Sequence, residues 1–293
     1  MKRCLFTLIA LFCLLLTSAQ VRVDAGSSPT PMKPVEKIIY DTAHVTVIYD
    51  YGCSEAIVNG SPSRRYSEVA LFIGEKYIGT MDWRGFKADS LQDDFYRNKR
   101  GSFEDFLNCY INDEQNISAY SYPVVVNLES QVATLLLSTT LSDYRYCQQL
   151  PKIDWKLENE EKKIKGIRCL KATCRFGGRD WTAWYAPEYA MPYGPYLFNG
   201  LPGLIMQVVD KKKNFAFKFK GIEKNSSGRY LYMNKIENEI ETTREKAREG
   251  IKNYCKDPTK VLRELGRLPE NKTSIVEVYT QGHGVPYNPI ELE

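Results

Sequence analysis

FNGLPGLIMQVVD, residues 198–210, is the stretch of sequence that says most about the fold. Pro202 suits the first central position of a four-residue turn, and Gly203 can take the positive φ that a type II turn needs at the second. Residues 204–209 then run apolar on both faces apart from Gln207, as in a strand that is covered on both sides. The stretch therefore predicts a type II turn that leads into a central strand.

The residues around this stretch predict further antiparallel strands. Gly177-Gly178 suits the positive φ values of a tight hairpin turn, with strands expected within 153–176 before it and at 179–186 after it. Alternating apolar and polar residues, or β-branched and aromatic ones, predict the other strands. These lie at residues 44–51, 68–83, 124–138 and 214–223.

Helices are predicted mainly near the end of the chain. Residues 86–112 are polar and irregular, and we expect them to be partly helical. Asp257-Pro258 can cap and start a short helix that Gly266 ends. The sequence thus predicts an α+β fold, mainly antiparallel β: a curved open sheet or half-barrel with one or two helices in the C-terminal third. Before that short helix, an apolar stripe repeats at three- and four-residue spacing: Ile236, Ile240, Thr243, Ala247, Ile251 and Tyr254.

The first residues have the layout of a secretory signal peptide. Lys2 and Arg3 precede an apolar run at 4–16, and small residues follow at 17–19. We expect a signal peptide at 1–20, a flexible lead-in at 21–36 and a single β-rich domain at 37–293. The chain would then be secreted across the inner membrane to the periplasm or cell surface. No later apolar run is long enough to cross a bilayer as a helix.

Charge and cysteine content fit an exported protein. The formal net charge of +4 falls to +2 when Lys2 and Arg3 are removed, so the charge does not indicate nucleic acid as a partner. An even number of cysteines in an exported chain favours disulfides, whose pairing the sequence leaves open. Metal binding is the weaker interpretation because there is no CxxC motif and the histidines are far apart. The disulfide candidates are Cys53, Cys109, Cys147, Cys169, Cys174 and Cys255.

An ordered set of short motifs fills residues 153–210. It comprises Cys169-Leu170-Lys171-Ala172, Gly178-Arg179, Trp181, Ala183-Trp184-Tyr185, Gly194-Pro195, Phe198 and Gly200-Leu201-Pro202-Gly203-Leu204-Ile205. With this pattern the chain resembles the GLPGLI family, secreted proteins of Bacteroidetes bacteria that take their name from the last motif. The final residues, Asn288-Pro289-Ile290-Glu291-Leu292, also resemble the usual end of that family. The chain departs from the pattern at Ile167-Arg168, Cys174 and Ala190-Met191. The resemblance implies export but supplies no activity.

The sequence offers few catalytic sets. A Ser-His or Cys-His site needs a base, and the histidines, His44 and His283, both lie outside the motif region. Phosphate loops, dinucleotide fingerprints and zinc helices are missing. Asp154, Asp180 and Glu188 lie among aromatic residues and could supply two carboxylates for hydrolysis. We therefore expect a non-enzymatic protein, and keep as an alternative a carboxylate-dependent hydrolase of envelope polymers.

Aromatic residues just before the opening stretch are the candidate binding site. Strand alternation sends half of them to the core, and the other half could line a concave sheet surface that stacks on a ligand. The sequence favours an envelope protein that acts as a binding, carrier or scaffold module for a protein or apolar ligand. It predicts no cofactor and no metal. The binding candidates are Arg179, Trp181, Trp184, Tyr185, Tyr193 and Tyr196.

Overall fold

The computed structural model describes residues 31–58, 61–111, 119–139, 141–266, 268 and 287–293. The predicted signal peptide, most of the predicted lead-in and His283 lie outside these residues. The strands are β1 (Lys37–Val58), β2 (Ser61–Ile73), β3 (Tyr77–Asp82), β4 (Val124–Asn127), β5 (Val132–Ser138), β6 (Asp143–Gln149), β7 (Lys156–Ile164), β8 (Ile167–Phe176), β9 (Arg179–Ala186), β10 (Leu204–Asp210), β11 (Phe215–Asn234) and β12 (Ile240–Glu241). The helices are α2 (Trp83–Arg97), α3 (Phe103–Ile111), α4 (Arg244–Lys256) and α5 (Pro258–Glu264).

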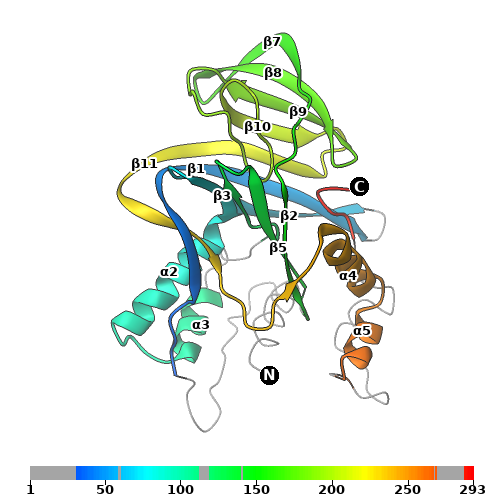
Figure 1. The fold of residues 1–293 in the computed structure, drawn as a ribbon. Coiled ribbons are helices and arrows are strands. Elements are labelled where there is room, and N and C mark those ends of the chain that lie inside the picture. The colour runs from blue at the N-terminus through cyan, green and yellow to red at the C-terminus, as the bar shows by residue number, and fades with distance from the viewer. Residues whose placement is uncertain (1–30, 59–60, 112–118, 140, 267, 269–286) are drawn as a thin grey trace.

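The strands form one open, 12-stranded sheet in the order β12-β6-β5-β4-β3-β2-β1-β11-β10-β9-β8-β7. All neighbours run antiparallel except β12 and β6, which are parallel. The predicted, mainly antiparallel open sheet is confirmed at this level. Figure 1 shows the long strands β1 and β11 crossing the middle of the molecule, with β7–β10 on one side and the helices on the other.

The helices differ from the prediction in one respect. They are not confined to the C-terminal third, because α2 and α3 lie in the first half of the chain. The predicted apolar stripe also begins too early. Ile240 lies in the exposed strand β12, and α4 starts only after Thr243, whose hydroxyl accepts a hydrogen bond from the Lys246 amide.

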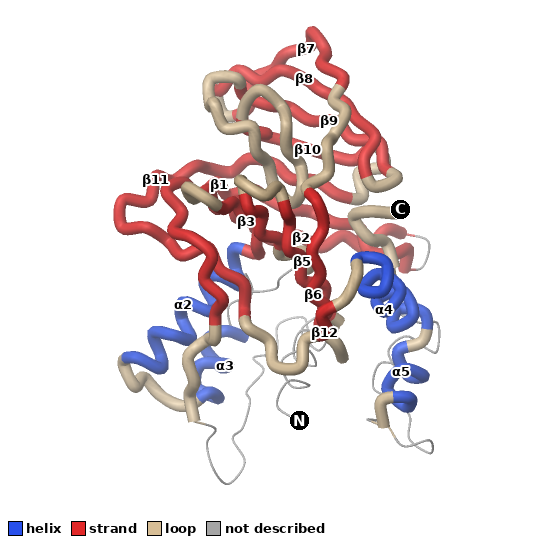
Figure 2. Tube along the Cα trace, in the orientation of Figure 1, coloured by secondary structure: helices blue, strands red, loops and turns tan. Residues whose placement is uncertain are grey.

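The two faces of the sheet carry separate cores, because side chains alternate along each strand. Tyr49 and Tyr51 of β1 belong to the larger core, which α4 covers in part, whereas Ile48 points to the other face. There it joins Phe72, against which Phe86 of α2 packs. The helix pairs α2/α3 and α4/α5 therefore lie on opposite sides of the molecule (Figure 2).

The segment between β9 and β10 packs on the larger core. The Tyr196 amide donates to the Thr80 hydroxyl in β3 at 3.0 Å, and the Tyr49 hydroxyl donates to the Ile205 carbonyl at 2.8 Å. Phe198 is buried, with its ring 4.7 Å from that of Trp181. These contacts join strands from both halves of the sheet through one apolar interior.

The opening stretch forms a central strand, as predicted, but not a type II turn. The Gly203 amide donates to the Leu201 carbonyl at 2.8 Å, which closes a three-residue turn around Pro202. Gly203 has φ +154°, and a Cβ there would lie 2.3 Å from the Ala186 carbonyl oxygen. Close approach to β9 therefore shapes this turn. The Leu204 amide then donates a hydrogen bond to the Tyr189 carbonyl at 3.1 Å, and β10 begins at this residue.

The predicted disulfides are not formed. None of the six cysteines, all within the described part of the chain, takes part in a disulfide. Cys169 and Cys174 share strand β8, and the other four lie on four different elements. The Cys169 thiol donates to the Ile167 carbonyl in the interior, and the exposed Cys147 thiol lies 3.5 Å from the Thr134 hydroxyl.

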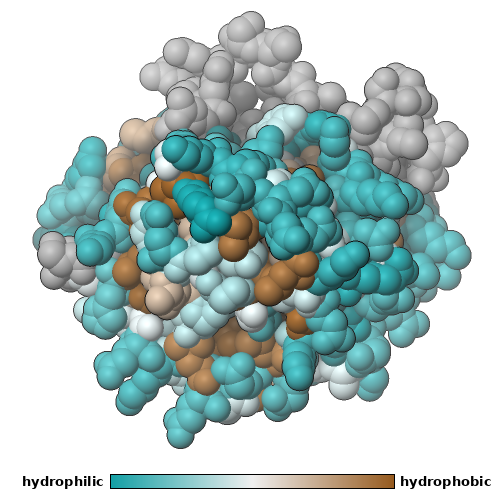
Figure 3. Space-filling view, turned by 90° about the horizontal axis from the view of Figure 1, so that it is seen from above, coloured by the Kyte–Doolittle hydropathy of each residue, from teal (hydrophilic) through white to brown (hydrophobic). Residues whose placement is uncertain are grey.

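The surface over β7 is strongly charged. β7 is an edge strand with sequence KLENEEKKI, most of it exposed, and such charges discourage pairing with another chain. Figure 3 shows mainly hydrophilic side chains on the face seen from above, with hydrophobic groups between them. In the described residues, no helix is both long and apolar enough to cross a membrane.

Candidate functional site

A cavity of about 160 Å³ lies between the larger core, α4 and the last described residues, 287–293, which we call the C-terminal strap. Its aliphatic lining includes Leu137 of β5 and Ile251 of α4. Polar lining groups include Ser121, Arg248, Asn288 and Glu291. The remaining wall is mostly aromatic: Tyr51, Tyr122, Tyr146, Tyr196, Phe215 and Tyr287.

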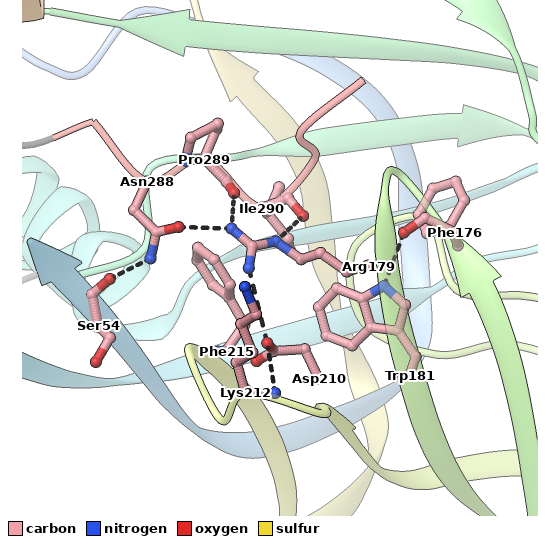
Figure 4. Close-up of polar contacts among 10 residues, drawn as sticks. All are labelled: Ser54, Phe176, Arg179, Trp181, Asp210, Lys212, Phe215, Asn288, Pro289 and Ile290. Atoms are coloured by element: carbon pink, nitrogen blue, oxygen red, sulfur yellow. Dashed lines mark hydrogen bonds and ion pairs between the residues drawn. The ribbon is translucent and has the colours of Figure 1, made fainter.

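Arg179 holds the strap in place. The hairpin Gly177-Gly178, with φ of 55° and 71° as predicted, places Arg179 at the start of β9. Its guanidinium donates to Asn288 Oδ1 at 2.6 Å and to the carbonyls of Pro289 and Ile290 at 2.6 and 3.0 Å (Figure 4). A residue that the sequence offered as a ligand contact thus binds the chain's own C-terminal segment.

Asp210 and Phe215 support the Arg179 side chain from below the strap. The Asp210 carboxylate lies 3.7 Å from Arg179 Nη1 and also accepts from the Phe215 amide at 2.6 Å. The guanidinium stacks over the Phe215 ring at 4.8 Å. Burial lowers the pKa of Arg179 and the Asp210 charge opposes this change, so the cation is paired where water is excluded.

Glu291 ties the other end of the strap to the segment after β9 and to α4. Its carboxylate accepts hydrogen bonds from the Tyr196 hydroxyl and from Arg244. Arg248, one turn further along α4, donates to the carbonyls of Glu291 and Glu293 at 2.8 and 2.7 Å. The charged groups of the lining are therefore already engaged with the strap.

The Tyr51 hydroxyl is the unusual polar group of the cavity. Tyr51 is 1% exposed, and its hydroxyl makes no hydrogen bond with any described residue. Burial raises the pKa of Tyr51 well above 10.0, and the nearby Cys53 thiol adds to this rise. That thiol donates to the Ala119 carbonyl at 3.8 Å instead. Tyr51 is thus a neutral phenol whose hydroxyl is enclosed within the wall, next to the Cys53 thiol.

The other phenols of the wall are also held neutral. Burial is the main cause that raises the pKa values of Tyr122, Tyr146 and Tyr196 above their ordinary value. Among the described lining residues there is no histidine, and the Glu291 carboxylate is occupied. The described part of the wall is suited to binding an apolar molecule.

The structure does not bring the six predicted binding residues together. Only Tyr196 lines the cavity, and Arg179 contacts its wall through the strap. Trp181 and Tyr185 are buried in the core, where the Trp181 indole donates to the Phe176 carbonyl. The other two candidates, Trp184 and Tyr193, are half-buried outside the lining.

The three carboxylates considered for hydrolysis also lie apart from the cavity. Asp154, Asp180 and Glu188 are exposed and none lines it. Asp180 forms an exposed ion pair with Arg175 at 3.3 Å.

The residues of the GLPGLI stretch belong mainly to the hydrophobic core and do not line the cavity. Leu201, Leu204 and Ile205 are fully buried, whereas Pro202 is exposed. A Cβ on Gly194 would lie 2.8 Å from Ile205 Cδ1, so this glycine lets the segment before β10 lie close to the strand.

Tyr51 is a lining residue that the sequence did not single out. Its alternation with Tyr49 in the strand predicted at 44–51 does place both on one face. Only the packing of Tyr122 and the distant strap around it turns this face into a cavity wall.

Comparisons with known proteins give little further information. No protein-family model and no curated protein matches the chain. Two solved structures of PNGF-II, in space groups P21 and C2, share 13% and 12% sequence identity with it, at TM-scores of 0.44 and 0.42. The matches cover 73% and 72% of this chain but only 34% and 33% of PNGF-II, so the chain spans about a third of that protein's length. A likeness at this level supports no conclusion about function.

Proposed function

We propose that this chain is a non-enzymatic binding module that holds a small apolar ligand in the cavity beneath the C-terminal strap. The observation that carries the proposal is a concave space of about 160 Å³ between α4 and the C-terminal strap, whose wall is mostly apolar and aromatic.

The composition of the wall supports the same proposal. Small-molecule sites are concave and mostly apolar, with a few polar groups that fix the orientation of the ligand. Here Leu137, Ile251 and the aromatic side chains supply the apolar surface. No comparable observation favours a hydrolase, because Asp154, Asp180 and Glu188 are exposed and separate from this surface.

The setting of this activity is part of the proposal. The signal-peptide layout of residues 1–20 supports export to the periplasm or cell surface, and the GLPGLI resemblance supports membership in a secreted family. A single domain at 37–293 would then act at the cell envelope as a binding or carrier module for the ligand.

Binding of acetophenone to the purified chain tests the proposal. Ligand-observed NMR should show saturable binding to one site, with a dissociation constant that a titration provides. The variant Ile251→Trp enlarges a side chain in the cavity wall and should weaken binding at least about tenfold. Leu157→Trp is the control, since Leu157 is 55% exposed on edge strand β7. No binding by the native chain, or equal binding by Ile251→Trp, would refute the proposal, provided that circular dichroism shows both variants folded.

A further inference from the structure

We infer that one end of the sheet binds an anionic lipid surface through Arg64 and the three lysines of the loop between β10 and β11, Lys211, Lys212 and Lys213. These four exposed residues are called the basic rim. None of them lines the cavity, so the inference goes beyond the proposed function and does not depend on it.

Main-chain hydrogen bonds bring the four residues of the rim to the same end of the sheet. On one side of the lysine loop, the Lys211 amide donates to the Asp180 carbonyl of β9 at 2.8 Å. On the other side, the Ser54 amide of β1 donates to the Asn214 carbonyl at 2.6 Å. Arg64 of β2 lies opposite Ser54 in the strand register. The rim is therefore one row that crosses neighbouring strand ends.

Asp210 holds the lysine loop in a defined conformation. Its buried carboxylate accepts from the Lys212 amide at 3.2 Å (Figure 4) and from the Phe215 amide at 2.6 Å. Its carbonyl accepts from the Lys213 amide at 2.8 Å. Lys213 has φ +59°, a conformation that glycine or asparagine adopts at lower cost. Because the loop is already ordered, binding through its lysines costs little further backbone entropy.

The positive charge of the rim is largely uncompensated. Arg64, Lys212 and Lys213 form no ion pair with any residue that the structure describes. Lys211 lies 4.0 Å from the Asp180 carboxylate, but their side chains are 81% and 51% exposed, so this pair is weak. The rim thus presents cations that can pair with an external anion.

Acidic side chains lie at the β8–β9 end of the row. Asp180 is shared with Arg175, at 3.3 Å. Glu293 is exposed beside Gly178, where an added Cβ would lie 3.4 Å from its side chain. Elsewhere on the sheet, Lys220 pairs with Asp50 at 3.9 Å, so cations there have partners. The excess of positive charge is therefore local to the rim.

A lipid surface suits the rim better than a single small anion. Neighbouring strands are about 4.8 Å apart, so the row from β9 to β2 extends over roughly 20 Å, and one phosphate ion cannot contact all four residues. Tyr66 lies two residues from Arg64 on the same face of β2 and is 63% exposed. Tyrosine is enriched at membrane–water interfaces, where its ring and its hydroxyl meet different surroundings.

Sedimentation with lipid vesicles tests the inference. The native chain should bind phosphatidylcholine vesicles that contain about one third phosphatidylglycerol at least about thirtyfold more tightly than vesicles of phosphatidylcholine alone, and added salt should weaken this binding. A rim variant should reduce the preference to less than about fivefold, because each lysine near an anionic surface contributes a similar share of the attraction. This variant combines Lys211→Gln, Lys212→Gln and Lys213→Gln.

A second triple variant on α4 is the matched control. It removes the same charge from exposed lysines of one other element and should keep the preference. Residues 1–30 are the same in all three proteins, so they cannot cause a difference between them. Circular dichroism checks that both variants fold. The control combines Lys246→Gln, Lys252→Gln and Lys256→Gln.

Several outcomes would overturn the inference. These are equal affinity of the native chain for the two kinds of vesicle, or equal losses in the rim variant and the control. Competition by inorganic phosphate at the lipid-phosphate concentration would indicate a site for the free ion. Binding of soluble dextran sulfate as tight as that of the anionic vesicles would indicate a soluble polyanion as the partner. Acetophenone binding does not involve the rim, so the failure of either proposal leaves the other standing.

Discussion

Arg179, the first residue of β9, donates to Asn288 of the C-terminal strap at 2.6 Å, across more than a hundred residues of sequence. The same guanidinium is 3.7 Å from the Asp210 carboxylate and almost fully buried. One arginine thus links the sheet to the segment that forms one wall of the cavity.

Replacing Arg179 by lysine should destabilise the protein strongly. Lysine keeps the charge but cannot donate to Asn288, Pro289 and Ile290 at once, because its ammonium is a single point rather than a planar fork. We expect a loss of about 2–4 kcal/mol in the free energy of unfolding, measured by urea denaturation.

Arg175→Lys is the matched control for this change. Arg175 lies on the neighbouring strand β8 and pairs with Asp180 where both side chains are exposed. Its replacement should change the free energy of unfolding by less than about 0.5 kcal/mol. Similar losses in both variants would show that the strap contacts of Arg179 contribute little.

Gly203→Ala should also destabilise the protein. The new Cβ would lie 2.3 Å from the Ala186 carbonyl oxygen and 2.9 Å from Pro187 Cα, both backbone atoms that cannot move independently. We expect a loss of more than about 2 kcal/mol and a lower thermal midpoint. Gly221→Ala in β11 is the control, because a Cβ there meets nothing within 4 Å. A Gly203→Ala variant as stable as Gly221→Ala would contradict this account.

Local patterns in the sequence predicted most of the sheet. The Gly177-Gly178 hairpin and the alternating residues of β9 depend on dihedral preferences and side-chain period, which neighbouring residues determine. The type II turn at Gly203 was predicted wrongly because its geometry depends on Ala186, which the sheet brings next to it. Disulfides were expected from the predicted export of the chain and from its even number of cysteines, and neither of these determines how close two thiols lie in the fold.

The candidate site depends on contacts between distant segments, and so the sequence could not define it. Tyr51 is separated from Tyr122 and from the strap by long stretches of chain, yet all line one cavity. A binding site was predicted near the GLPGLI stretch because aromatic residues are frequent there. Several of these residues pack in the hydrophobic core instead, as the burial of Trp181 and Tyr185 shows.

Asp89 should make stability depend on pH. Asp89 lies on α2, where it accepts a hydrogen bond from the Tyr232 hydroxyl of β11 at 3.0 Å, and Lys37 and Asp93 are the charged groups near it. Burial raises the pKa of Asp89 from 3.8 to about 6. The folded state therefore holds its proton at pH values where the unfolded state has lost it. Stability contributed by this group is present below about pH 4 and decreases as pH rises towards 6.

The variant Asp89→Asn tests this pH dependence. It should be more stable than the native chain at pH 7, by about 1 kcal/mol because the side chain is only half-buried, and should show less loss of stability between pH 4 and 6. Urea denaturation at several pH values measures both effects. Asp154→Asn, at an exposed position, serves as the control. Parallel pH curves for the native chain and Asp89→Asn would refute the raised pKa.

Two tyrosines of β1 should respond in opposite ways to removal of the hydroxyl. Tyr49 and Tyr51 lie on the same face, and both are almost fully buried. The Tyr49 hydroxyl donates to the Ile205 carbonyl at 2.8 Å, whereas that of Tyr51 has no partner among the described residues. Tyr49→Phe should therefore cost about 1–2 kcal/mol in the free energy of unfolding, through the lost bond.

Tyr51→Phe should leave stability unchanged or raise it by up to about 1 kcal/mol when no ligand is present, because an unsatisfied polar atom is removed from the interior. Thermal unfolding of both variants measures the two effects. A loss of stability in Tyr51→Phe as large as that in Tyr49→Phe would mean that the Tyr51 hydroxyl has a strong hydrogen-bond partner within the folded chain.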